Sequence, residues 1–209
     1  ALSIAGAAEA SINSNRSSNF VATWTQSPGV GSVVQAVRLD ATGPLGAVET
    51  LTSGPALATH PQAIVESDGQ SVIVWQLASG GTDLIQAAGL PLFGHAGPTI
   101  DVSTPGTIPT PASVSGESGG NIVAAWTQID GGDTRVMAAY ISNGGTSSTQ
   151  LPALSDVGAN TGTPRVAQSR DQGIAVVWRQ DGLINNSIYA STFQSGQTPS
   201  APIQLSDGA

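Results

Sequence analysis

The sequence contains no cysteine and no lysine, and each absence excludes certain functions. Without cysteine the chain can form no disulfide, no thiol nucleophile and no cysteine-ligated zinc site. Only 10% of its residues are charged, and six arginines stand against 14 acidic residues, which leaves a net charge of −8. Such an acidic chain lacks the basic stripe needed to bind nucleic acid. No apolar run approaches the roughly 18 residues of a membrane-spanning helix, so we expect no membrane insertion.

What is present indicates a folded chain that is rich in turns. Its 209 residues are 39% hydrophobic, which is enough to bury a sizeable core. Glycine and proline contribute 26 and 13 residues, a share that lies below the roughly 25–30% of low-complexity sequences. These residues predict frequent turns between short elements.

The clearest pattern is the spacing of the four tryptophans, which are 51, 51 and 52 residues apart. Each ends a short apolar run, and each is followed at a constant interval by an alanine and further on by an aliphatic residue with a hydroxyl residue beside it. The tryptophans are Trp24, Trp75, Trp126 and Trp178, and the alanines are Ala36, Ala87, Ala138 and Ala190. Such a repeat indicates that one supersecondary unit occurs four times.

Each copy is predicted to form four short strands, which in the second copy span 62–66, 71–76, 84–90 and 99–103. The second strand is apolar without alternation, so we expect both of its faces to be buried. A four-stranded sheet buried on both faces and repeated every ~50 residues is typical of a β-propeller blade. The tryptophans would then fill the space between sheets, although a ring of sugar-stacking platforms is an alternative.

We therefore predict an all-β fold, namely a β-propeller of four antiparallel four-stranded blades, or a four-blade part of a larger propeller. The whole chain, 1–209, forms one domain with blades at approximately 1–56, 57–107, 108–159 and 160–209. The alternative architecture pairs the copies into two β-sandwiches.

A known repeat is similar to these copies. Pro164-Arg165-Val166-Ala167, followed by a turn and then Ala175-Val176-Val177-Trp178, resembles a repeat of bacterial secreted and surface proteins, which continues with an Ile-x-Ala strand and a Leu-Ser ending. The resemblance covers nearly the whole chain, and the first copy departs most, at 14–18. It implies propeller blades and an exported or cell-surface bacterial protein, and it implies no particular activity.

Candidate binding residues gather at one end of the predicted blades. With the strands of a blade lettered a to d, the a–b and c–d turns lie at one end, and the b–c turns and d–a connections lie at the other. The second end collects Asp and Gln side chains, which can bind a polyhydroxylated ligand or a hard cation, although they also simply form turns and strand ends. The predicted ligand-binding residues are Asp83, Asp130, Asp133, Asp181, Gln26, Gln128 and Gln180. No loop has the alternating aspartates of a calcium site, so we predict no metal and no cofactor.

Little in the sequence suggests catalysis. His60, just before an a strand, and His95, in a c–d turn, are expected in solvated loops at opposite ends of the second blade. There is no Gly-x-Ser-x-Gly motif, and no spacing marks a pair of catalytic carboxylates. We therefore predict that the chain is not an enzyme and is an exported binding module with lectin-like carbohydrate binding on the b–c/d–a end. The alternatives are a protein–protein scaffold on the bacterial surface and a glycoside-active enzyme. The expected partners are a glycan or a surface protein, and a second copy that completes a larger ring.

Overall fold

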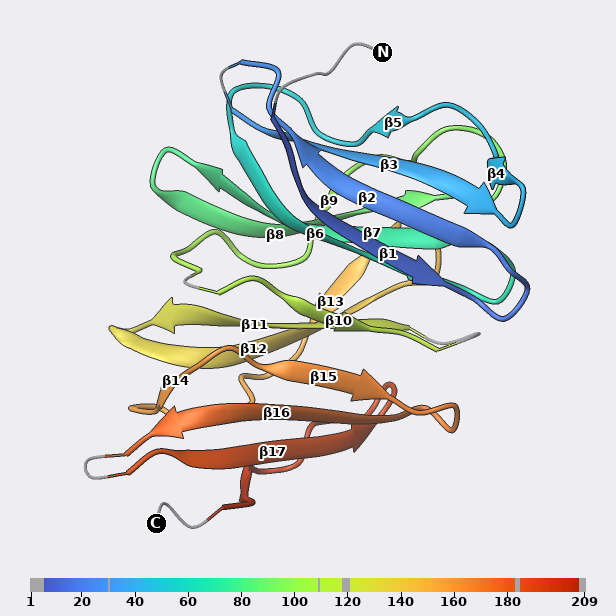
Figure 1. The fold of residues 1–209 in the computed structure, drawn as a ribbon. Helices are drawn as coiled ribbons and strands as arrows, with labels where there is room; N and C mark the ends of the chain where they lie inside the picture. The colour runs from blue at the N-terminus through green and yellow to red at the C-terminus, as the bar shows by residue number, and fades with distance from the viewer. Residues whose placement is uncertain (1–5, 30, 109, 118–120, 183–184, 207–209) are drawn as a thin grey trace.

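The computed structural model describes residues 6–29, 31–108, 110–117, 121–182 and 185–206, and it forms four antiparallel sheets (Figure 1). We name these sheets blades 1 to 4. Blade 1 contains β1 (Ala7–Ser14), β2 (Phe20–Gln26), β3 (Val33–Asp40), β4 (Gly43–Pro44) and β5 (Glu49–Thr50). Blade 2 contains β6 (Leu57–Val65), β7 (Ser71–Ser79), β8 (Thr82–Leu90) and β9 (Ile100–Asp101). Blade 3 contains β10 (Ser113–Ser115), β11 (Ile122–Asp130), β12 (Asp133–Ile141) and β13 (Ser148–Gln150). Blade 4 contains β14 (Asn160–Thr161), β15 (Arg165–Gln168), β16 (Gly173–Asp181), β17 (Ser187–Gln194) and β18 (Ile203–Gln204).

The blades follow one another in chain order, and each packs on the next (Figure 1). The a strands are β1, β6, β10 and the β14/β15 pair, and each is hydrogen-bonded to the b strand of its own blade. The a–b turns of blades 1, 2 and 4 lie at the right of Figure 1, and the b–c turns of blades 2 and 3 lie at the left. Four-stranded antiparallel sheets were predicted, and this is confirmed. Because blade 2 packs on blade 1 and also on blade 3, the chain does not form two separate sandwiches.

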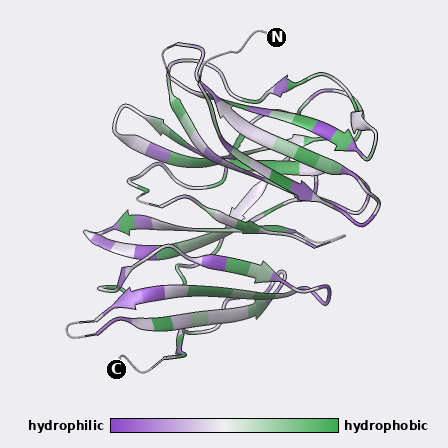
Figure 2. Cartoon of the chain, viewed as in Figure 1, coloured by the Kyte–Doolittle hydropathy of each residue, from purple (hydrophilic) through white to green (hydrophobic). Residues whose placement is uncertain are grey.

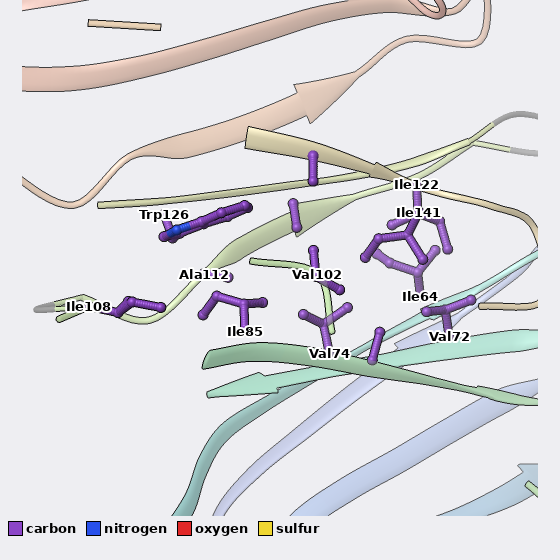
Figure 3. Packing of buried hydrophobic residues seen from close by; sticks show 13 residues of the cluster. Ile64, Val72, Val74, Ile85, Val102, Ile108, Ala112, Ile122, Trp126 and Ile141 are labelled. Atoms are coloured by element: carbon purple, nitrogen blue, oxygen red, sulfur yellow. The ribbon is translucent and has the colours of Figure 1, made fainter. Parts of the chain in front are cut away.

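The core consists of three apolar clusters, and each lies between two successive blades. Hydrophobic residues recur along the strands, whereas hydrophilic residues gather toward the turns (Figure 2). In the middle cluster, Trp126 of blade 3 lies above Ile85 and Val74 of blade 2 (Figure 3). Trp75 and Trp178 are buried in the same way against blades 1 and 3. The prediction that the tryptophans fill the space between sheets is therefore correct for these three. Among the described residues, no helix has the length and hydropathy needed to cross a bilayer.

The b strands differ in burial although their sequences are alike. In blades 2 and 3 the apolar part of the b strand is buried on both faces. In blades 1 and 4 the burial alternates, so that Ala22 and Trp24 of β2, and Ala175 and Val177 of β16, are only partly buried. The expectation of two buried faces was thus wrong for the end blades, because the described residues place no blade against one face of each.

The c-strand position two places after the repeated alanine meets the c–d turn of the next blade in three different ways. In blade 1, Arg38 Nη2 donates to the carbonyl oxygen of Gly94 at 2.8 Å. In blade 3, the Tyr140 hydroxyl accepts a turn N–H of blade 4 at 3.1 Å. In blade 2 the residue is Gly89, where a Cβ would lie 1.8 Å from the carbonyl oxygen of Gly144. Burial lowers the pKa of Arg38 and raises the pKa of Tyr140, so both groups are enclosed at these contacts.

Candidate functional site

The a strands line the inner side of the stack, and side chains join them to one another. Val65 N–H donates to Asn13 Oδ1 at 3.1 Å, which links blade 2 to blade 1. Gln168 N–H donates to Ser115 Oγ at 3.0 Å, which links blade 4 to blade 3. Gln62 Nε2 donates to a carbonyl oxygen of blade 3 at 2.6 Å. These bonds hold the ends of the a strands, and therefore the a–b turns, in fixed relative positions.

The a–b turns of all four blades meet around one cavity. Its volume is ≈ 750 Å³, which lies within the roughly 300–1,000 Å³ of small-molecule sites. The lining comes from residues 13–17 of blade 1, 64, 65 and 67 of blade 2, 114–117 of blade 3 and 170 of blade 4. We call this the axial cavity. Two other cavities of the described residues are lined by blades 3 and 4 and by blade 4 alone.

Three charged side chains line the axial cavity, namely Arg16, Glu117 and Arg170. The two arginines are exposed and occupy the same place in their turns, eight residues before the tryptophan of blade 1 and of blade 4. In the part of the chain that the structure describes, none of the three forms an ion pair. Guanidinium groups can donate hydrogen bonds to a ligand in the cavity, and Glu117 supplies a carboxylate of the kind that acid–base chemistry uses.

The residues beside Glu117 explain how its position is set. Gly116 precedes it, and a Cβ there would lie 2.9 Å from the side chains of Ile64 and Ile122, so a larger residue would push the turn away from blade 2. The equivalent residue in blade 2, Glu66, also stands nine residues before its tryptophan, but it is only 2% exposed. The carboxylate in the cavity is therefore that of blade 3.

Sequence reasoning missed this site because its residues differ from one copy to the next. The position nine residues before the tryptophan holds Asn15 in blade 1 and a glutamate in blades 2 and 3. Asn15 Nδ2 donates to the carbonyl oxygen of Glu66 at 2.7 Å. Alignment of the four copies at this position would have identified two of the chain's few acidic residues at one repeat position.

The predicted binding residues lie at the opposite, b–c end of the blades, and two of them have an equivalent internal role. Asp83 Oδ2 accepts the N–H of Ile108 at 3.1 Å, and Asp133 Oδ2 accepts the N–H of Gly158 at 3.0 Å. Each bond spans 25 residues and ties the start of a c strand to the connection into the next blade. These aspartates stabilise the joints between blades.

The other predicted residues also have contacts within the protein. Asp130 pairs with Arg135 at 2.9 Å, and Asp181 pairs with Arg179 at 3.0 Å. Gln128 Oε1 accepts the indole N–H of its own strand's tryptophan at 3.1 Å. Gln26 is buried at the end of β2, and Gln180 lies in β16 opposite Ser187. None of the seven lines the axial cavity, and their role in binding stays a prediction.

A second polar pair lies at the b–c end of the a strands. His60 is part of β6 and not of a loop, and it sits in a bulge, as does Glu9 in β1. His60 N–H donates to Glu9 Oε2 at 2.8 Å, and its Nε2 lies 3.6 Å from Glu9 Oε1. Both residues have φ of 53°, a strained conformation for residues other than glycine that is often found at functional sites. In the described chain, no three His, Asp or Glu side chains gather as a metal site.

Solved structures share this fold, whereas no protein-family model and no curated protein matches the chain. A Dyadobacter fermentans protein of unknown function has a TM-score of 0.65 and 13% identity, over 97% of this chain and 70% of its own. A Penicillium chrysogenum α-L-arabinanase complexed with arabinobiose has a TM-score of 0.57 and 10% identity, over 97% and 68%. The GH93 α-L-arabinofuranosidase of Fusarium graminearum with arabinobiose has a TM-score of 0.54 and 11% identity, over 95% and 66%. At such identities the likeness shows the fold, and the predicted propeller architecture is confirmed.

The same likeness overturns two expectations about function. The chain was predicted to be a non-enzymatic, lectin-like module, yet two of these neighbours are glycoside-cleaving enzymes. That prediction depended on the absence of a local catalytic motif. In a propeller, however, residues that are far apart in the sequence converge from different blades, as Arg16 and Glu117 do here. The absence of a motif therefore does not argue against catalysis on this fold.

Proposed function

We propose that this protein hydrolyses glycosidic bonds and that its substrate binds in the axial cavity. The observation that carries the proposal is the convergence of residues from all four a–b turns on one cavity that contains a carboxylate, Glu117, and two arginines, Arg16 and Arg170. The remaining lining is largely Asn and Ser, whose side chains donate and accept hydrogen bonds to sugar hydroxyl groups. The propeller fold shared with the arabinanase and the arabinofuranosidase supports this assignment.

In this proposal, Glu117 acts as the proton-transferring carboxyl group. Glycoside hydrolysis usually employs two carboxyl groups, one that protonates the leaving oxygen and one that activates water or attacks the anomeric carbon. We assign the first role to Glu117. Water forms the new bond to the anomeric carbon as the glycosidic bond breaks, and it gives its proton to solvent. Arg16 and Arg170, from the two end blades, donate to sugar oxygens and thereby fix the substrate against blade 3. Glu66 occupies the equivalent position in blade 2 but is enclosed, so we assign it a positioning role for the turn that carries Ser67.

The first substrates to examine are glycans with L-arabinofuranosyl residues, because two fold neighbours are complexed with arabinobiose. An exported or surface location, which the resemblance to bacterial secreted proteins implies, would suit such a polymer. The cavity lies among the a–b turns. We therefore propose that a short stretch of the glycan enters it from the end of the blades that carries these turns.

The test measures release of 4-nitrophenol from 4-nitrophenyl α-L-arabinofuranoside and of reducing sugar from arabinan. Glu117→Gln is nearly the same size as glutamate but cannot transfer the proton, so kcat should fall about 10²–10⁴-fold. Two control variants, Glu9→Gln and Asp130→Asn, change carboxylates at the other end of the blades and should leave kcat within about twofold. A wild-type chain that releases no product from any arabinoside would overturn the proposal. Loss of activity in Glu9→Gln together with a fully active Glu117→Gln would move the reaction to the opposite end of the blades.

A further inference from the structure

The contact between successive blades is built the same way three times. The tryptophan of one blade lies against the c strand of the preceding blade, and Trp75, Trp126 and Trp178 are 1%, 0% and 2% exposed. The receiving aliphatic residue, ten residues after the preceding tryptophan, is Val34, Ile85 or Val136, and each is 0% exposed. The interface thus has a tryptophan half and a receiving half.

Among the described residues, each end of the stack presents one of these halves without its counterpart. On blade 1, Trp24 faces outward from β2 and is only partly buried, with its indole N–H bonded to Gln35 Oε1 at 3.1 Å. On blade 4, the receiving residue is Ile188, which is 41% exposed. Leu205 is 59% exposed, whereas its equivalents in blades 2 and 3, Val102 and Leu154, are 1% and 2% exposed.

We propose that these two faces pack on each other between two copies of this chain, with blade 1 of one copy against blade 4 of the other. Trp24 of one copy would then lie on Ile188 and Leu205 of the second copy and repeat the contact already present three times within the chain. The required partner must offer both a protruding tryptophan and an aliphatic receiving strand at the spacing between blades. A second copy of this chain carries both surfaces.

The predicted contact is heterologous, because the two faces come from different blades. Two such contacts between two copies close a ring of eight blades, whereas one contact alone leaves an open pair of arcs. Outward-facing apolar residues on both halves favour association by removal of apolar surface from water. The end faces are separate from the axial cavity, so this association does not depend on the proposed function.

The experiment is analytical ultracentrifugation of the 209-residue chain and three variants over a wide range of concentrations. The wild type should sediment at twice the monomer mass. Trp24→Ala removes the tryptophan half and Ile188→Asp places a charge on the receiving half, so each should raise the dissociation constant of the dimer at least about tenfold. Val157→Asp is the matched control, because Val157 is 78% exposed and lies on neither end face, and it should remain dimeric.

Mixing the two interface variants makes the test specific for head-to-tail packing. The Trp24→Ala copy retains an intact blade 4 and the Ile188→Asp copy retains an intact blade 1, so the mixture should form heterodimers through one restored contact. Circular dichroism of each variant checks that the sheets are retained. A wild-type monomer at all concentrations, dimers in both single variants, or a mixture that stays monomeric would each overturn the inference.

Discussion

The burial difference between equivalent tryptophans predicts unequal effects of the same substitution. Trp126 is 0% exposed between blades 2 and 3, and its indole N–H donates to Gln128 Oε1 at 3.1 Å. Trp126→Ala removes the ring, leaves an enclosed cavity and deprives a buried amide of its partner, so it should lower the free energy of unfolding by about 4 kcal/mol. Trp24→Ala opens only toward solvent and leaves no enclosed cavity, so its cost in the monomer should be about 2 kcal/mol.

Urea denaturation followed by far-ultraviolet circular dichroism measures both losses without relying on tryptophan fluorescence. The protein concentration is kept below that at which the wild type associates, so that each value refers to the monomer. Linear extrapolation with an unchanged slope assigns the change to stability and not to the compactness of either state. Equal decreases in the free energy of unfolding for Trp126→Ala and Trp24→Ala would refute the reasoning. They would show that burial against a neighbouring blade does not account for the cost of removing Trp126.

Two further predictions concern the joints and the turns. Asp133→Ala should lower stability by about 1–2 kcal/mol in the same urea assay, because the turn N–H that it bonds at 3.0 Å loses a charged acceptor; an unchanged midpoint would show that water replaces it. The Thr42 hydroxyl and N–H donate to the Asp40 carboxylate and hold its pKa below the ordinary 3.8. The ionised carboxylate therefore stabilises the fold at pH values above 3.8. This contribution to stability is lost as the pH falls through the lowered pKa. Asp40→Ala should therefore lower the melting temperature at pH 7 more than at pH 2, and an equal shift at both would contradict this account.

The repeat made most of the fold predictable, because the tryptophan and alanine spacings depend on packing between sheets. Burial at the two ends was not predictable from the strand itself. Val177 belongs to an apolar run much like that of β7, yet it is only partly buried, because none of the described blades covers its face. Whether a neighbour is present cannot be read from the pattern of one strand.

The axial cavity was less predictable than the fold. Aspartates in the b–c turns were predicted to bind ligand from their residue type and their place at one end of the blades. However, Asp83 accepts a bond from an N–H 25 residues away, a partner that no local pattern indicates. Arg16, Glu117 and Arg170 stand in turns of three different copies. Their proximity depends on how the a strands are arranged around the inner side of the stack, which the three-dimensional structure supplies.

The varied contacts with the c–d turns have a consequence for the order of the blades. Similar neighbouring repeats can pair with the wrong partner during folding. Here Arg38 donates a hydrogen bond to a carbonyl oxygen in the turn of the next blade, and the Tyr140 hydroxyl accepts one from a turn N–H. Gly89 packs directly against the backbone of the turn that it faces. A blade seated beside the wrong neighbour would clash or leave one of these groups unsatisfied. The four copies have therefore become non-interchangeable, and a gene in which two blades were permuted would encode a chain whose surfaces no longer fit.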